Sequence, residues 1–594
     1  MLQPSNRLTL LDAMRPPEGF GVDAAMAITF TLDLRALLAA PAAFVLGTRE
    51  SVVDDGTQQE PIELLHALRA HAEKLTVMSH VGEIALPPSR GVFAFLERAV
   101  VPVRAPLGGV VHPKVWVLRY RSHDAQRLRV LVASRNLTFD ASWDTIVRLD
   151  EADNGAGDLG AVGELFEGLI PHAVADPGSV HADRVAGLAA DLRRVRFALP
   201  RGVDDLSVVV LGLRRGPSPL PSDTERSLLI SPFVGDDFFA RVRPSPLDAL
   251  VSRPEQLDQL GHRSLAAVRS LYAFDDGSAT DFAADGDRRS PRDPGRPLVG
   301  LHAKVFAFED GGRARVFLGS ANATGEAFGR NVEMLLELTG SVAHLGIDRL
   351  CEGSGDELGF EALLVPYRSD PDGADEDAGP DALDQARRAI AGLAIDGRVE
   401  PDDGGWAVTY RSAAELPVVE GTTITCWPLA APGSRRVVPG GRLLEERFGA
   451  SLETVSGFLA FEVRHDDGGL TQFVVPAALD GVPEERDRAL LRSLIGDGER
   501  FLRYLLALLA DDSSRMELLD ALEVPGADGA GDRETGETLP VLEQLLRTVR
   551  RDPSRLLALD PLVTDLAADE ALPPGFEEMW CALCAVAVDA EGAR

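Results

Sequence analysis

Residues 300–338 read GLHAKVFAFEDGGRARVFLGSANATGEAFGRNVEMLLEL. This stretch combines a His-x-Lys, a Ser-x-Asn and an Asn-x-Glu motif. Their residues are His302 and Lys304, Ser320 and Asn322, and Asn331 and Glu333. The chain has 60 Lys and Arg residues together, but its only lysines are Lys74, Lys114 and Lys304. The ammonium group of Lys is compact and rotatable, whereas the guanidinium group of Arg is planar. In a chain that uses Arg almost everywhere, a lysine therefore indicates a position where a guanidinium cannot replace the ammonium group.

A second copy of the same pattern lies earlier in the chain. Residues 109–149 read GVVHPKVWVLRYRSHDAQRLRVLVASRNLTFDASWDTIVRL. Both copies run in the order His-x-Lys, apolar strand, charged turn, apolar strand, Ser-x-Asn. In the first copy these motif residues are His112, Lys114, Ser134 and Asn136. The repeat predicts two similar structural units.

The repeated residues indicate phosphodiester chemistry. Period-two alternation predicts that each His and Lys share one face of a strand, and the following strand ends at Ser-x-Asn. Two such units facing each other gather two His, two Lys and two Asn. One imidazole can attack phosphorus while the other protonates the leaving oxygen, and the lysines and amides stabilise the developing charge. No metal ligand cluster is evident, so we expect no metal and no other cofactor.

With these residues, the chain resembles the phospholipase D superfamily, whose paired His-x-Lys motifs form one active site between two similar α/β halves. The second copy matches the usual string of the family, including Asn331 and Glu333. The first copy, with HPKVWVL and SRNLTFDASWD, is more similar to the tyrosyl-DNA phosphodiesterase branch. The resemblance extends over residues 20–350. It implies that His112 is the nucleophile and His302 the general acid.

One feature departs from the family pattern, and another bears on the roles of the two histidines. The aspartate that many members carry five residues after the lysine is replaced by Arg119 and Glu309. We expect Glu333 to orient His302 and to make it the more basic histidine. The first copy has no evident counterpart of Glu333, and Asp144 is its nearest carboxylate.

We predict an α/β fold of two similar phospholipase D-like α/β sandwich halves, followed by a small β unit and a helical region. The predicted boundaries are 1–185 for the first half, 186–365 for the second half, 366–387 for an acidic linker, 388–482 for a β-rich domain and 483–594 for the helical C-terminal region.

The net charge of −33 argues against a protein that coats nucleic acid non-specifically, but it leaves room for a locally basic cleft. The candidate substrate-binding residues near the motifs are Arg135, Arg253 and Arg330. Four cysteines are too few for a disulfide framework in 594 residues. The sequence shows no evident signal peptide and no apolar stretch of membrane-spanning length, which predicts a cytoplasmic protein that does not bind membranes.

These observations favour a metal-independent nuclease or DNA-processing phosphodiesterase that acts through a phosphohistidine intermediate. The resemblance also suggests a role in bacterial antiviral (phage) defence, with a helicase or another defence protein as partner. The alternatives are a phospholipase or transphosphatidylase, and a non-catalytic DNA-binding subunit that keeps the cleft only to hold phosphate.

Overall fold

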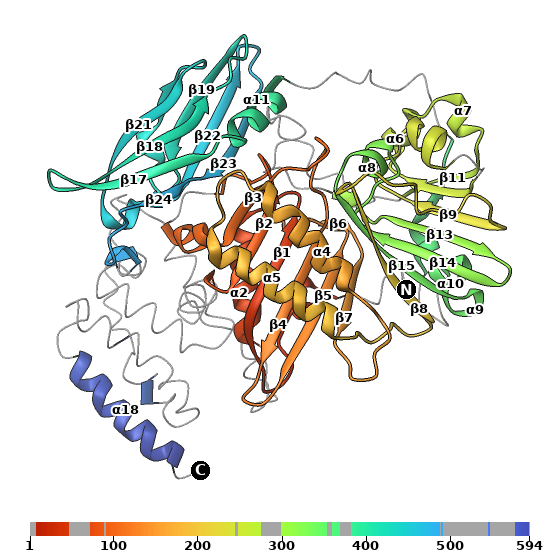
Figure 1. Cartoon of the computed structure of the whole chain (residues 1–594), viewed down its shortest axis with the longest axis horizontal. Helices are drawn as coiled ribbons and strands as arrows, with labels where there is room; N and C mark the ends of the chain where they lie inside the picture. Colours follow the sequence, from red (N-terminus) through yellow and green to blue (C-terminus); the bar gives the residue numbers. More distant parts are fainter. Residues whose placement is uncertain are drawn as a thin grey trace, which may run out of the picture.

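The computed structural model describes residues 8–46, 72–87, 91–138, 141–243, 247–274, 299–352, 359–368, 382–487, 489–490, 545–546, 563 and 576–592. Within these ranges, the chain forms two mixed α/β halves, a third unit of two small sheets, and one long helix near its C-terminal end (Figure 1). The predicted fold class of two similar α/β halves followed by a small β unit is confirmed. The predicted helical region lies largely outside the described residues.

The first half is built on a sheet with the strand order β3-β2-β1-β4-β5-β7. Its strands are β1 (Gly21–Thr29), β2 (Leu75–His80), β3 (Val100–Val103), β4 (Val115–Arg121), β5 (Gln126–Ala133) and β7 (Ile146–Asp150). β1, β2 and β3 are parallel, whereas β4, β5 and β7 pair antiparallel with their neighbours. The three parallel strands therefore end at one edge of the sheet, which is where ligands bind in α/β folds.

The second half repeats this topology. Its sheet has the order β16-β11-β10-β9-β13-β14-β15-β8, and its central six strands match the first sheet in order and direction. The strands are β8 (Asp205–Leu211), β9 (Arg226–Ile230), β10 (Leu247–Ser252), β11 (Val268–Phe274), β13 (Val305–Asp310), β14 (Arg313–Gly319), β15 (Glu333–Ser341) and β16 (Leu364–Pro366). The two copies of the sequence motif thus occupy equivalent strands, β4–β5 and β13–β14.

Helices cover both sheets. Those of the first half are α1 (Leu10–Met14), α2 (Leu34–Leu46), η1 (Gly91–Ala99), α4 (Gly160–Leu169), η2 (Ile170–His172) and α5 (Gly178–Arg194). Those of the second half are η3 (Phe238–Val242), α6 (Pro254–Asp258), α7 (His262–Leu265), α8 (Gly325–Gly329), α9 (Val342–Leu345), α10 (Ile347–Cys351) and η5 (Phe360–Leu363). In Figure 1, α4 and α5 lie side by side across the face of the first sheet.

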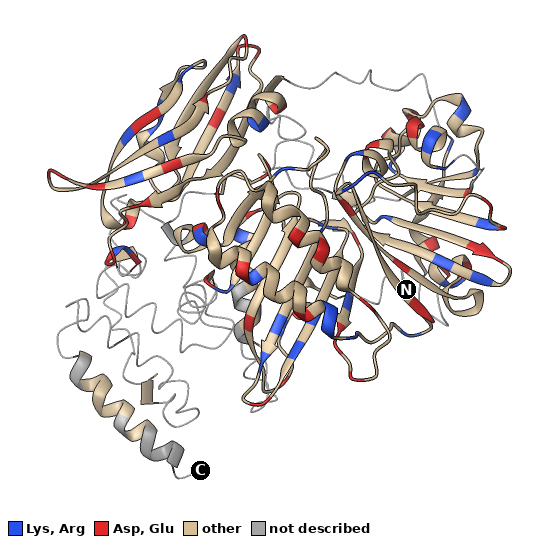
Figure 2. Ribbon diagram, viewed as in Figure 1, with Lys and Arg blue, Asp and Glu red and all other residues tan. Residues whose placement is uncertain are grey.

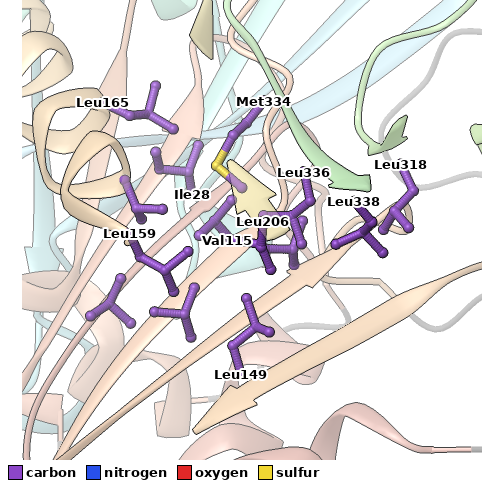
Figure 3. Packing of buried hydrophobic residues seen from close by; sticks show 14 of the residues in the cluster. Ile28, Val115, Leu149, Leu159, Leu165, Leu206, Leu318, Met334, Leu336 and Leu338 are labelled. Carbon is purple, nitrogen blue, oxygen red and sulfur yellow. The ribbon is translucent and has the colours of Figure 1, made fainter. Parts of the chain in front are cut away.

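One continuous hydrophobic core joins the two halves. Alternate residues of β1 divide between two cores, because side chains on a strand point to opposite faces. Met26 and Ile28 enter the core that both halves share, while Ala25 and Ala27 face the core under α2. Figure 3 shows Ile28 and Leu165 of the first half near Met334 of the second. Each large aliphatic side chain buried here contributes about 1.5–3 kcal/mol, so the halves are held together by apolar packing.

The third unit consists of two four-stranded sheets that share one core. One sheet contains β17 (Ile395–Asp402), β18 (Gly405–Glu415), β21 (Leu443–Ala450) and β24 (Ala478–Asp480). The other contains β19 (Thr422–Pro428), β20 (Arg436–Val438), β22 (Phe458–His465) and β23 (Leu470–Pro476). The short elements η7 (Pro432–Ser434) and η8 (Leu452–Thr454) connect strands, and α11 (Ala382–Ala391) packs against β22 and β23.

The third unit docks on the first half through buried ion pairs. The guanidinium of Arg387 in α11 lies 2.9 Å from the carboxylate of Glu83, and both side chains are almost fully buried. Glu97 accepts hydrogen bonds from Arg486 at 2.6 Å and from the backbone of Gly457 at 2.6 Å. Trp427 and Phe458 of the third unit also enter the core under α2. These contacts fix the third unit beside the edge where β1, β2 and β3 end.

The structure differs from the predicted domain boundaries at two points. The predicted boundary between residues 185 and 186 falls inside α5, whose pattern of buried residues continues from Val185 to Leu192. The predicted linker to residue 387 is also too long, because α11 begins at Ala382. In both cases a helix adjoins a polar segment, and composition alone does not locate the ends of the helix.

Beyond the third unit, the described residues include one long helix, α18 (Phe576–Gly592). No helix in the described part of the chain is long and apolar enough to cross a membrane.

We predict that Arg387→Met weakens the docking of the third unit. The substitution leaves the carboxylate of Glu83 buried without the guanidinium of Arg387, whereas Asp384 keeps its pair with Arg388, and removing one partner of a buried ion pair costs about 3–5 kcal/mol. Urea denaturation measures the change in the free energy of unfolding. The matched control is Arg411→Met, which breaks the exposed Arg411–Glu445 pair and costs about 0–1 kcal/mol. Equal losses in the two variants would contradict the prediction.

Candidate active site

Each His-x-Lys motif lies immediately before a strand rather than within it. The strands β4 and β13 begin at Val115 and Val305, one residue after each lysine. Both ammonium groups bend back to the carbonyl oxygen of their own histidine: Lys114 Nζ donates to His112 at 2.6 Å, and Lys304 Nζ to His302 at 2.6 Å. The motif is thus a short extended link with the same local geometry in both halves.

The two histidine segments pair with the opposite half. The N–H of His112 donates to the carbonyl of Val332 at 2.9 Å, and the N–H of His302 donates to the carbonyl of Trp143 at 2.8 Å. The second pairing continues in the short parallel sheet of β6 (Ala141–Trp143) and β12 (Val299–Leu301). The two motifs therefore meet at one place between the halves.

A glycine permits the closest of these approaches. A Cβ placed on Gly109 would lie 2.5 Å from the carbonyl oxygen of Arg330, so no larger residue fits there. The next residue, Val110, donates its N–H to the side-chain oxygen of Asn331 at 3.1 Å. Asn331 is therefore a residue that joins the halves.

The Ser-x-Asn motifs follow β5 and β14 and form the same turn twice. Ser134 Oγ accepts from the N–H of Thr145 at 2.8 Å, and Ser320 Oγ accepts from that of Met334 at 3.0 Å. The strand ends lie beside the lysines, because the N–H of Ala133 donates to the carbonyl of Lys114 at 2.8 Å. This turn places Asn136 and Asn322 at the same sheet edges as the histidines.

Glu333 orients His112, and our expectation that it would orient His302 was wrong. Its Oε2 lies 2.9 Å from Nδ1 of His112 and also accepts from the hydroxyl of Ser320. Glu333 begins β15 one residue after Val332, the residue that pairs with His112. The carboxylate of the second half is thus delivered to the imidazole of the first half, a contact that sequence separation does not reveal.

Asp144 is the structural counterpart of Glu333. It follows Trp143 as Glu333 follows Val332, and it precedes Thr145, the partner of Ser134. Its side chain is one methylene shorter and lies 3.2 Å from the guanidinium of Arg135. The two halves therefore differ in the carboxylate offered across the interface.

The two histidines have different partners at Nδ1. With Glu333 as acceptor, Nδ1 of His112 carries its proton, and Nε2 keeps a lone pair. Nδ1 of His302 instead lies 3.3 Å from Lys304 Nζ. An amine that donates to Nδ1 leaves the proton of neutral His302 on Nε2. The geometry gives His112 a nucleophilic nitrogen and His302 a donor nitrogen.

Burial lowers the pKa values of all four cationic groups. Burial lowers the pKa of His112 to about 4, although the nearby Glu333 carboxylate raises it. Burial, followed by the charges of Lys304 and Lys114, lowers the pKa of His302 well below its ordinary value. The pKa of Lys114 falls to about 7 and that of Lys304 falls well below its ordinary range, with burial as the main cause.

The carboxylate supports the basicity of His112, so the expectation that His302 is the more basic histidine was also wrong. His302 lies among cations, and each of the main influences on its pKa lowers it. This cluster of cations is suited to binding an anion. A phosphodiester between the lysines and histidines would favour their charged forms.

The centre is nearly closed and contains unpaired polar atoms. The side chain of His112 is 12% exposed, whereas that of Glu333 is fully buried. The buried Oδ1 atoms of Asn136 and Asn322 have no hydrogen-bond partner in the described structure. Rotation of either amide would present N–H donors at the same place. These amides are therefore available to a polar group that enters the centre.

The three candidate arginines occupy different environments. Arg253 donates to the carbonyl of Leu301 at 2.8 Å, next to His302, and its charge lowers the pKa of His302. Arg135 pairs with Asp144 beside the Ser-x-Asn turn. Arg330 is exposed at the end of α8 and pairs with Glu326 of the same helix. The structure thus places Arg253 closest to the chemistry.

The replaced aspartate positions lie away from the site. Five residues along a strand cover about 16 Å, so Arg119 and Glu309 sit toward the far ends of β4 and β13. Arg119 pairs with Asp23 and Asp191, and Glu309 pairs with Arg226. Both residues belong to ion pairs that hold the sheets to their surroundings.

Sequence reasoning missed Phe30 and His80, which form the wall behind His112. Phe30 lies edge-on to His112 with ring centres 5.3 Å apart, and it stacks on His80 at 5.4 Å. Nδ1 of His80 accepts from the N–H of Val111 at 3.3 Å. A usable signal was present, because TVMSH and ALVSR both end a parallel strand with Ser and a basic residue.

No group of three or more His, Cys, Asp or Glu side chains that could hold a metal ion occurs among the described residues.

We predict that phosphate binding takes up protons. The pKa of Lys114 is about 7, so much of it is neutral at pH 8. An anion favours the ammonium form and raises this pKa, so protons enter on binding. Calorimetry with phosphate or vanadate at pH 8, in buffers of different ionisation enthalpy, measures the uptake. The Lys114→Met variant should take up fewer protons, and proton release by the unsubstituted protein would contradict the prediction.

No protein-family model matches the chain, and no curated protein matches its sequence. Two solved structures are similar to it at low identity. A mutant of yeast tyrosyl-DNA phosphodiesterase is 11% identical, with a TM-score of 0.31, over 58% of this chain and 86% of that one. A polyphosphate kinase from Porphyromonas gingivalis is 13% identical, with a TM-score of 0.26, over 55% of this chain and 41% of that one. The described chain thus spans less than half of the kinase.

Proposed function

We propose that this protein is a metal-independent phosphodiesterase that cleaves nucleic acid through a phosphohistidine intermediate. The observation that carries the proposal is the joining of two His-x-Lys motifs at one buried centre, with the Glu333 carboxylate on Nδ1 of His112. The resemblance of both motif copies to the phospholipase D superfamily supports the same reaction class.

In the first step, Nε2 of His112 attacks phosphorus while Glu333 accepts the hydrogen bond from Nδ1. A P–N bond forms, the P–O bond to the leaving group breaks, and the imidazolium form of His302 gives its Nε2 proton to the leaving oxygen. In the second step, His302 takes a proton from water, whose oxygen attacks phosphorus. The P–N bond breaks and His112 is regenerated.

The cations complete the site. Lys114 and Lys304 are placed to stabilise the non-bridging oxygens, whose charge in turn raises the pKa values of the lysines and of His302. Substrate charge therefore prepares the general acid for the first step.

The likeness of the first motif copy to the tyrosyl-DNA phosphodiesterase branch favours nucleic acid over a membrane lipid as the substrate. Figure 2 shows acidic and basic residues interspersed along the folded units in this view. With a net charge of −33, binding relies on a few arginines near the centre, of which Arg253 is the best placed. A place in antiviral defence and a helicase partner are further predictions that rest on the resemblance alone.

We predict that the purified protein cleaves labelled DNA in excess EDTA, because histidines supply both nucleophile and acid. Parallel reactions use single-stranded DNA, duplex DNA and phosphatidylcholine vesicles. Lys304→Met should lower the rate by about 100-fold or more, since one charge-stabilising donor is typically worth 10²–10³-fold. Cleavage of lipid without cleavage of DNA, or complete dependence on added magnesium, would overturn the proposal.

We predict that the covalent phosphate is found on His112. His112→Asn should abolish adduct formation, whereas His302→Asn should slow water attack, so that adduct accumulates on substrates with good leaving groups. Acid quenching is avoided and the adduct is mapped by mass spectrometry. His123→Asn is the control, because His123 is exposed and outside the site. Phosphate on His302 in the unsubstituted protein would reverse the two roles.

A further inference from the structure

The walls of the catalytic centre are built from equivalent positions of the two halves. His80 lies at the end of β2, and Arg253 lies directly after the end of β10. The two residues therefore occupy equivalent positions in the two halves. His80 contacts the backbone of Val111, and Arg253 contacts that of Leu301, which is the equivalent residue. The halves therefore offer a histidine on one side and an arginine on the other.

A second pair of equivalent positions flanks the first. The hydroxyl of Thr29 donates to the carbonyl of Thr31 at 2.7 Å, and that of Ser231 donates to the carbonyl of Phe233 at 2.7 Å. Thr31 is buried and its hydroxyl contacts Glu83, whereas Phe233 is 37% exposed. The same backbone turn thus presents a covered threonine in one half and an open aromatic ring in the other.

The first-half side is covered by the third unit. A Cβ placed on Gly82 would lie 3.5 Å from Ala391 and 3.6 Å from the backbone of Arg388, so α11 rests directly on the turn after His80. Arg387 closes this contact through its buried pair with Glu83. His80 is 3% exposed, and α11 covers the turn that follows it.

The second-half side combines a cation with the exposed ring. The guanidinium of Arg253 lies 5.2 Å from the ring centre of Phe233. Arg253 is also close enough to affect the pKa values of His302 and Lys304. Phe233 is held near Asn322, because the Ser231 hydroxyl also accepts from the N–H of Ala323 at 3.0 Å. This side therefore adjoins the general acid.

We propose that Phe233 and Arg253 form the subsite for the leaving strand, in which an unpaired nucleobase stacks on Phe233 and Arg253 attracts the adjoining phosphate. This inference rests on the proposed function and names its substrate class as single-stranded nucleic acid. In the proposed reaction the leaving group departs toward His302, the histidine beside this subsite. A base in a duplex is already stacked and paired, so it is not available to the ring.

The test compares single-stranded oligonucleotides that carry either a normal nucleotide or an abasic residue on the leaving side of the scissile phosphate. Stacking of one base is typically worth about 5- to 100-fold in affinity. Phe233→Leu should therefore raise KM on the normal oligonucleotide by about that factor, with a smaller change in kcat. The increase in KM that Phe233→Leu causes on the abasic oligonucleotide should be at least about fivefold smaller. Phe233→Tyr should keep KM close to that of the unsubstituted protein, because tyrosine retains the aromatic ring.

Two controls separate a binding role from a structural one. Leu443→Ala removes an exposed apolar side chain of the third unit and should leave both substrates unaffected. Phe233→Trp, combined with His112→Ala to prevent turnover, should lose indole fluorescence when the normal oligonucleotide binds and retain more of it with the abasic one.

The outcomes are distinguishable. Equal losses on both oligonucleotides, no loss on either, or unquenched fluorescence with bound DNA would overturn the subsite while the nuclease proposal stands. Absence of cleavage of any DNA by the unsubstituted protein would instead overturn the proposed function.

Discussion

The exchange of backbone pairing between the two halves is the constraint on which the centre depends. His112 pairs with Val332 and His302 pairs with Trp143, so each half supplies the strand that positions the other half's histidine. Because Glu333 directly follows Val332, this pairing delivers its carboxylate to Nδ1 of His112. The apolar core shared by both halves holds the exchange in register. The first half on its own would have neither the second imidazole nor this carboxylate.

The two halves have similar backbone geometry around the centre but different side chains at some equivalent positions. The proposed chemistry depends on these differences. Glu333 reaches an imidazole, whereas the shorter Asp144 pairs with Arg135. These substitutions give one histidine an acceptor at Nδ1 and leave the other among cations. In the proposed mechanism, this asymmetry assigns the attack to one histidine and the proton donation to the other.

The third unit is part of the architecture around the centre. Its helix α11 rests on the turn after His80, and the buried pair between Arg387 and Glu83 fixes that contact. An ion pair this deeply buried is costly to break. The charge of −33 is compatible with an anionic substrate because the cations that matter are few and lie close to the centre.

The sequence by itself determined the repeat, the mixed α/β class and the residue types of the site, because periodicity and spacing are local properties of the chain. His112, Lys114, His302 and Lys304 were therefore found by their pattern. Only the tertiary structure decided which histidine receives Glu333, that Phe30 and His80 stand behind His112, and that α11 covers one side. Those contacts join residues 50 to 300 positions apart. They depend on how strands pair across two sheets, which no spacing in one chain segment encodes.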